Sequence, residues 1–229
     1  MHSGTSHAIY IESAQKKVFA VSMDWPGWCR FGRDEPSAIQ HLLDAARRYS
    51  EITKSADLDF RVPETSALFT VKARLKGNVT TDFGAPDILL ANDWDRVEED
   101  EMGRFVKLLN ACWLAFDKAV EKAEGKELKK GPRGGGRDLS KMMDHVVGAE
   151  EGYLKTLGWK FRLIETEARD ERKNRVRSEI LRGLQAAVEG KLPRKGPRGG
   201  KRWPPRFFVR RVAWHAVDHA WELEDRIIP

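Results

Sequence analysis

Cysteine is scarce in this chain: only Cys29 and Cys112 occur among 229 residues, and they lack the C-x-x-C spacing of redox and zinc motifs. A disulfide framework therefore does not organise the fold, and we expect two unlinked thiols, one of them buried in the core. A long hydrophobic run is also missing, because no apolar stretch approaches the roughly 18 residues that a membrane helix needs. With no basic-then-apolar leader at the start, the sequence predicts a cytoplasmic protein without a membrane segment.

The glycine-rich signatures of nucleotide sites are absent too. Neither G-x-x-x-x-G-K-[ST] nor G-x-G-x-x-G occurs, so we expect no nucleotide cofactor. Instead, one hexapeptide, KGPRGG, occurs twice, at residues 130–135 and 195–200, each time before a stretch with helical patterning. Tight glycine turns beside a helix N-terminus can bind an anion, although solvated, flexible connectors are the alternative interpretation. The candidate anion-binding residues are Lys130, Arg133, Arg137, Lys195 and Arg198, and the two segments can flank one pocket.

Positive charge is concentrated around these two copies. Residues 129–137 carry four basic residues and residues 194–211 carry eight, with no acidic residue in either segment. Because the whole chain has a net charge of only +6, its remainder is net acidic. Nucleic-acid binding needs clustered Lys and Arg to neutralise phosphates, so we expect a small molecule rather than a nucleic acid as the ligand.

The first 80 residues predict a small α+β domain. One amphipathic helix, with Pro36 in its first turn, lies among short β-prone runs. The strands are predicted at 8–11, 18–23, 58–62 and 67–75, and the helix at 35–53. Residues 81–92 are then expected to form a linker.

From residue 93 to 229 the apolar spacing is helical almost throughout. Four helices are predicted, at 95–124, 139–157, 165–189 and 205–227. Helices of this length pack as a bundle, whose facing members can bring side chains to an internal metal site. The predicted fold class is therefore an α+β N-terminal domain followed by an all-α, up-down four-helix bundle.

Three histidines are the candidate metal ligands. His215 and His219 are four residues apart in the last predicted helix, so both imidazoles project from one face at a spacing that suits a single divalent ion. His145 lies in the second predicted helix, which a bundle can place opposite the pair. Three protein ligands with an open fourth position are typical of a catalytic metal. The alternative is that the rings simply pack or form hydrogen bonds.

Nearby carboxylates are candidates for supporting roles. Asp218 and Glu222 each follow one histidine of the pair by three residues, so either can orient an imidazole through its second nitrogen. Glu150 lies on a different helix face from His145 and is a candidate general base. A solvated or ion-paired carboxylate is the alternative for all three, because most charged helix residues are exposed. The remaining histidines, His2, His7 and His41, are expected on the surface.

With one histidine on the second helix and H-x-x-x-H on the fourth, residues 93–229 resemble the DinB/YfiT-like four-helix bundle superfamily, which includes metal-dependent thiol transferases. This resemblance implies a divalent metal, often zinc or nickel, held by His145, His215 and His219 with water at the open position. The basic glycine loops and the N-terminal domain depart from the family pattern and leave the substrate open.

The N-terminal segments 9–12, 19–21 and 25–31 resemble a HicB-type β-β-α-β unit. That resemblance implies a domain that binds a partner or a nucleic acid, or serves only as a structural cap.

Together these features predict a divalent-metal-dependent enzyme, either a thiol S-transferase or a hydrolase. Its substrate is expected to be small and anionic or electrophilic, with a low-molecular-weight thiol as the candidate co-substrate. A homodimer is the expected assembly, because bundles of this kind commonly pair. The alternative is a non-catalytic binding or regulatory protein whose basic glycine loops bind an acidic partner or a nucleic acid.

Overall fold

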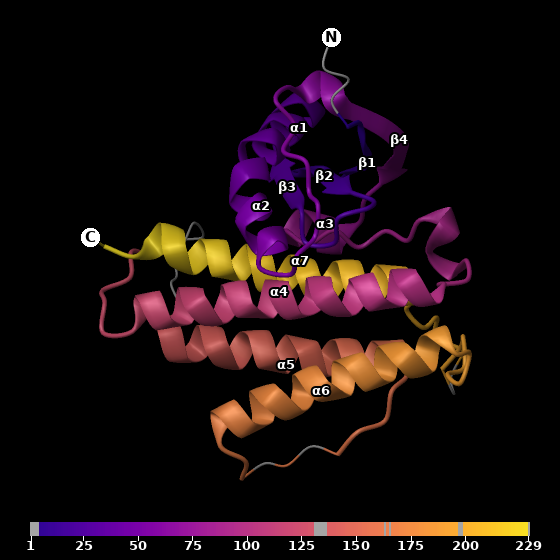
Figure 1. Ribbon diagram of the computed structural model, residues 1–229, viewed down its shortest axis with the longest axis vertical. Helices are drawn as coiled ribbons and strands as arrows, with labels where there is room; N and C mark the ends of the chain where they lie inside the picture. The colour runs from indigo at the N-terminus through magenta and orange to yellow at the C-terminus, as the bar shows by residue number, and fades with distance from the viewer. Residues whose placement is uncertain (1–4, 131–136, 163, 165, 197–198, 229) are drawn as a thin grey trace. The chain divides into compact units, whose positions relative to one another are not determined.

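The computed structural model describes residues 5–130, 137–162, 164, 166–196 and 199–228. The chain divides into two compact units, Met1–Leu90 and Ala91–Pro229. The first contains a sheet with helices and the second is helical, as Figure 1 shows for each unit by itself, so the α+β class is confirmed. Across the described residues, every helix is too short or too polar to cross a membrane.

The first unit is built on a mixed sheet of four strands: β1 (His7–Ser13), β2 (Val18–Ser22), β3 (Cys29–Gly32) and β4 (Phe69–Lys76). Their order is β3-β2-β1-β4, with β1 antiparallel to β2 and parallel to β4. The predicted strand at 58–62 is wrong, since those residues lie outside the sheet. The sequence missed β3 because it has only four residues and its two ends alone are buried, which is too short for a visible alternation.

The helix predicted at 35–53 is divided at Ala45 into α1 (Glu35–Asp44) and α2 (Ala46–Lys54). Asp34 caps α1 by accepting a hydrogen bond from the backbone N–H of Ser37, and the Ser37 hydroxyl accepts from the Asp34 N–H in return. Two large rings then fix the helices to the turn between β2 and β3. The indole N–H of Trp28 donates to the Leu42 carbonyl at 2.9 Å, and the Tyr49 hydroxyl donates to the Pro26 carbonyl at 2.7 Å.

His7 was expected on the surface but is buried at the start of β1. Its ring lies edge-on to Trp28, and its Nε2 is 2.8 Å from the carbonyl oxygen of Arg61. Burial lowers the pKa of this imidazole, so the ring is neutral at physiological pH. His41 is exposed as predicted, whereas His2 lies outside the described residues.

Residues 81–90, predicted as part of a linker, belong to the first unit. The cause is Glu12, a fully buried carboxylate in β1. It accepts hydrogen bonds from the Thr81 hydroxyl at 2.5 Å and from the backbone N–H groups of Asp87 and Ile88 at 2.8 and 3.0 Å. These bonds hold α3 (Val79–Phe83) and the segment after it against the sheet.

The second unit contains four long helices: α4 (Glu99–Ala123), α5 (Leu139–Leu157), α6 (Arg169–Val188) and α7 (Pro205–Arg226). Helices α4 and α7 lie side by side and run in the same direction (Figure 1). At one end Arg206 of α7 binds Glu101 of α4 at 2.7 Å, and at the other Lys122 of α4 binds Glu224 at 3.0 Å.

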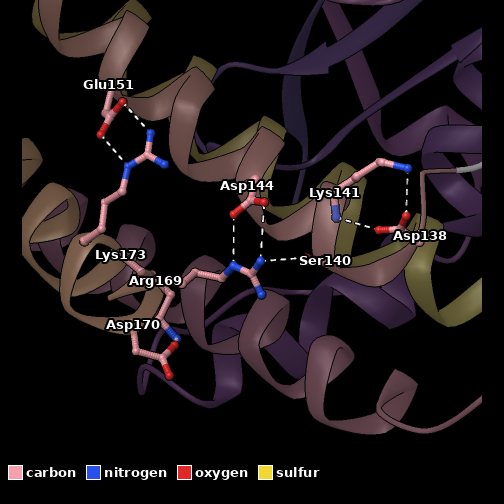
Figure 2. A network of polar contacts seen from close by, with 9 residues as sticks. Asp138, Ser140, Lys141, Asp144, Glu151, Arg169, Asp170 and Lys173 are labelled. Carbon is pink, nitrogen blue, oxygen red and sulfur yellow. Dashed lines mark hydrogen bonds and ion pairs between the residues drawn. The ribbon is translucent and has the colours of Figure 1, made fainter. Parts of the chain in front are cut away.

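Helices α5 and α6 also run parallel to each other, in the direction opposite to α4 and α7. Arg169, in the first turn of α6, binds Asp144 at 2.9 Å and Ser140 at 2.6 Å near the start of α5 (Figure 2). Further along, the indole N–H of Trp159, just after α5, donates to Glu179 of α6 at 2.6 Å.

The four helices therefore run up, down, down and up, and the predicted up-down order is wrong. Gly158, in the left-handed conformation with φ of 100°, ends α5. Residues 158–168 then separate α5 from α6. Helix α5 has 19 residues and is therefore about 28 Å long. The connection 158–168 has enough residues to span that length when it is extended. A tight turn would have forced α6 to be antiparallel to α5.

Apolar side chains from three of these helices form one core cluster beside the histidine-bearing turns. Its members are Phe116, Ala119 and Val120 of α4, Met142 and Val146 of α5, and Ala220 and Leu223 of α7. Val146 directly follows His145 and Ala220 directly follows His219. Burial of the apolar residues thus fixes the helix faces that carry the imidazoles.

Candidate metal centre

The structure brings the three candidate histidines together. His145 lies on α5, and His215 and His219 lie one turn apart on α7. The Nε2 atom of His215 is 3.3 Å from Nε2 of His145 and 3.1 Å from Nε2 of His219. A set of one ligand atom from each ring fits within 4.8 Å. Three nitrogen atoms therefore face a common point.

The two spacings from the His215 Nε2 atom are close to those that a metal ion requires. Zinc binds imidazole nitrogen at about 2.0–2.1 Å in tetrahedral geometry, which places neighbouring donor atoms about 3.4 Å apart. Hydrogen bonds alone explain the cluster less well. A neutral imidazole carries one N–H and one lone pair, so a single proton cannot satisfy both contacts of the His215 Nε2 atom along straight N–H···N lines. A cation accepts all three lone pairs.

Burial keeps two of the rings neutral, the form that binds a metal. Burial and the neighbouring His219 and Arg137 lower the pKa of His145 to about 4. The pKa of His215 lies well below its ordinary value of 6.5, first through burial and then through His219, His145 and nearby arginines. Both rings thus present lone pairs at physiological pH without first losing a proton.

Glu222 supports His219 from behind. Its Oε2 atom is 3.0 Å from the Nδ1 atom of His219, and this hydrogen bond lowers the pKa of Glu222, which is therefore ionised. An Nδ1–H that donates to Glu222 leaves the lone pair of His219 on Nε2, where the three rings meet. Glu222 therefore lies where its spacing of three residues from His219 predicts a carboxylate that orients the imidazole.

Arg226 completes this support, and the sequence interpretation missed it. Its guanidinium binds Glu222 at 3.2 Å and donates to the carbonyl oxygens of Lys129 and Arg137 at 2.8 and 2.9 Å. The same side chain therefore ties both flanks of the first basic segment to α7, the helix that carries His215 and His219. Its position four residues after Glu222, on the same helix face, was a signal that could have identified it.

Asp218 does not support His215 in the same way. Among the described residues, the buried Nδ1 atom of His215 has no hydrogen-bond partner. Asp218 therefore does not hold this nitrogen, although it follows His215 by three residues. The Tyr153 ring contacts His215 instead, edge-on, with ring centroids 5.6 Å apart.

Glu150 is neither solvated nor part of the histidine cluster. It is 1% exposed, and its Oε1 accepts a hydrogen bond from the indole N–H of Trp113 on α4 at 2.7 Å. Burial raises its pKa from 4.5 to about 7, despite the opposing effect of Arg177 on α6. Periodicity could not show that α4 and α6 cover this face of α5, so the solvated interpretation was wrong.

Replacing Glu150 with glutamine is expected to remove a pH-dependent loss of stability. The unfolded carboxyl releases its proton near pH 4.5 and the folded one near pH 7, so this group stabilises the protein least above pH 7. From pH 5.5 to 8.5 the native protein should lose about 2 kcal/mol relative to Glu150→Gln. Urea unfolding of both proteins at the two pH values measures this difference, and parallel pH profiles would contradict it.

The described parts of the two basic segments lie at opposite ends of the helical unit, so they do not flank one pocket. The first is held beside the C-terminus of α7 by Arg226, whereas the second lies beside the C-terminus of α5, where the Trp203 N–H donates to the Thr156 carbonyl at 3.3 Å. Because α5 and α7 are antiparallel, their C-termini lie at opposite ends of the helix pair, about one helix length apart.

Of the candidate anion-binding residues, Lys130 and Arg137 line a cavity of about 530 Å³ together with Arg226. Lys195 pairs with Lys201 in a short β-bridge of the second segment. Arg133 and Arg198 lie outside the described residues.

Comparison with known protein families, with curated protein sequences and with solved structures finds no match to this chain. The three converging imidazoles and their surroundings are therefore the basis for assigning a function.

Proposed function

We propose that this protein is a divalent-metal-dependent enzyme whose metal, zinc or nickel, is held by His145, His215 and His219. The observation that carries the proposal is the convergence of three Nε2 atoms from two helices at spacings of 3.1 and 3.3 Å. A divalent ion held by three neutral imidazoles keeps an open position, where it lowers the pKa of a bound water or thiol. The reaction class that fits is thiol S-transfer or hydrolysis of a small anionic or electrophilic substrate.

The protein's own residues have separate parts in this proposal. The imidazoles present lone pairs, and Glu222 with Arg226 holds His219 in the required tautomer. Arg137 places positive charge near His145 and His215, which favours an anionic ligand at the open position. Glu150 is directed at Trp113 and has no part in the metal site.

We further propose that α4 to α7 form a four-helix bundle of the DinB/YfiT-like type and that the first unit is HicB-like. Ligands on the second and fourth long helices support the former, and four strands with α1 covering the sheet support the latter. Metal identity follows availability, because three imidazoles accept several divalent ions.

Elemental analysis of protein prepared without a polyhistidine tag tests the metal centre. The native chain is expected to hold about one zinc or nickel ion, and both His145→Ala and the double variant His215→Ala plus His219→Ala are expected to lose it. His41→Ala, at an exposed histidine, is the matched control and should retain the ion.

Assays of thiol transfer and hydrolysis on electrophilic substrates then test the enzyme class. Activity that requires the metal supports the proposal. If the native protein takes up neither zinc nor nickel, the proposal fails. Salt-sensitive binding of RNA or of an acidic protein would then favour the non-catalytic alternative.

A further inference from the structure

Arg211, which the sequence interpretation did not single out, is surrounded by aromatic rings beside the candidate metal centre. It lies one helical turn before His215 on α7 and is partly exposed. Its guanidinium carbon is 5.7 Å from the ring centre of Tyr153, 5.9 Å from that of Trp203 and 5.2 Å from that of Trp214. Rings on several sides restrict the rotamers of a side chain that is otherwise long and mobile.

Two of these rings also contact the metal-facing imidazole. Tyr153 lies edge-on to His215 at 5.6 Å between centroids, and Trp214 lies 5.9 Å from it. Arg211 and His215 thus share the same aromatic walls, and the rise per helical turn separates them by about 5.4 Å along α7. The positive charge of Arg211 is close enough to contribute to the low pKa of His215.

Two glycines of α5 leave open space on the helix surface near His145. Gly152 follows His145 by seven residues, two helical turns along nearly the same face. A Cβ atom built on Gly148 or on Gly152 would meet no neighbouring atom within 4 Å. The surface beside His145 is therefore open where larger side chains would cover it.

Resting on the proposed metal centre, we infer that Arg211 binds the carboxylate of a small substrate or co-substrate whose reacting atom lies at the three histidines. A guanidinium presents parallel N–H donors that match a carboxylate, and its aromatic surroundings fix the direction of this fork. One helical turn separates the backbone positions of Arg211 and His215, so a ligand that joins the two groups has to be small. The assigned ligand class is therefore short carboxylic acids that carry a metal-binding group.

Cobalt-loaded protein provides the test, because thiolate bound to cobalt absorbs in the near ultraviolet. The tag-free protein is titrated with mercaptopropionate and with mercaptoethanol, which lacks the carboxylate. The native protein should bind mercaptopropionate at least about tenfold more tightly. In Arg211→Met, which retains an apolar stem against the rings, the two thiols should bind equally. Arg211→Lys should retain part of the preference.

Lys155→Met is the matched control, because Lys155 is an exposed basic residue on α5 and lies outside the aromatic cluster. This variant should keep the native preference. Equal affinities in the native protein, or a preference that persists in Arg211→Met, would overturn the inference while cobalt binding leaves the metal centre standing. A native protein that binds no cobalt overturns both. If Arg211→Met does not fold, the two thiols on the native protein and on Arg211→Lys still decide.

Discussion

Zinc at a thousand times its dissociation constant is expected to raise the free energy of unfolding by about 4 kcal/mol. The effect follows from mass action, because the folded chain brings three imidazoles together, whereas the unfolded chain separates His145 from His215 by 70 residues. Chemical denaturation with and without zinc, on protein without a tag, measures the gain. Each variant is compared with itself, so that an intrinsic loss of stability does not enter the result.

The double variant His215→Ala plus His219→Ala should gain no stability from zinc. Glu222→Gln tests the residue behind His219: it should retain zinc but bind it about 10 to 100 times more weakly. At a fixed zinc concentration its gain should then fall by about 1.4–2.7 kcal/mol. Equal stabilisation of the double variant and the native chain would show that zinc binds elsewhere.

Arg210→Met is expected to destabilise the protein by about 3–5 kcal/mol, because it leaves a buried carboxylate without its cation. Arg210 and Asp93 form two hydrogen bonds at 2.5 and 2.8 Å, and their side chains are only 8% and 0% exposed. This pair fixes the short helical segment Ala91–Trp94 to α7. Asp93→Asn should also be costly, and the double variant should cost less than the two single losses together.

The exposed pair Lys122 and Glu224 is the matched control, since it too joins α7 to another element. Lys122→Met should change stability by less than about 1 kcal/mol, because solvent screens an exposed pair. Urea unfolding of the native protein and of the four variants measures the contrast. A change of similar size in Arg210→Met and Lys122→Met would contradict the importance of the buried pair.

Much of the helical unit was predictable, because its apolar residues recur at three- and four-residue steps. The buried stripe of α6, with Val176, Ile180 and Leu184, follows this pattern directly. The direction of α6 was not predictable, since it depends on whether the connection after α5 leads the chain back to the start of α5. The strand β3 and the buried Glu12 were also beyond pattern reasoning, because short strands and buried charges are explained only by their partners.

For the site, the i, i+4 spacing of His215 and His219 determined their common face. The meeting with His145 depended on the antiparallel packing of α5 against α7, which we expected from the lengths of the four predicted helices. The prediction that Glu150 is exposed to solvent was wrong, because helices from elsewhere in the chain bury this carboxylate. The basic segments were placed together because they share a sequence, yet chain direction puts them at opposite ends.

Most residues of α7 are buried or contact the candidate site, so the helices of this unit should differ in how well they tolerate substitution. Fifteen of its 22 residues are buried, against five of the 20 in α6. Neighbouring positions on α7 serve the core, the histidine cluster and the anchoring arginines, so nearly every substitution disturbs one of them. We therefore expect α6 to tolerate substitutions and attached labels, whereas most changes on α7 should impair folding or the histidine cluster.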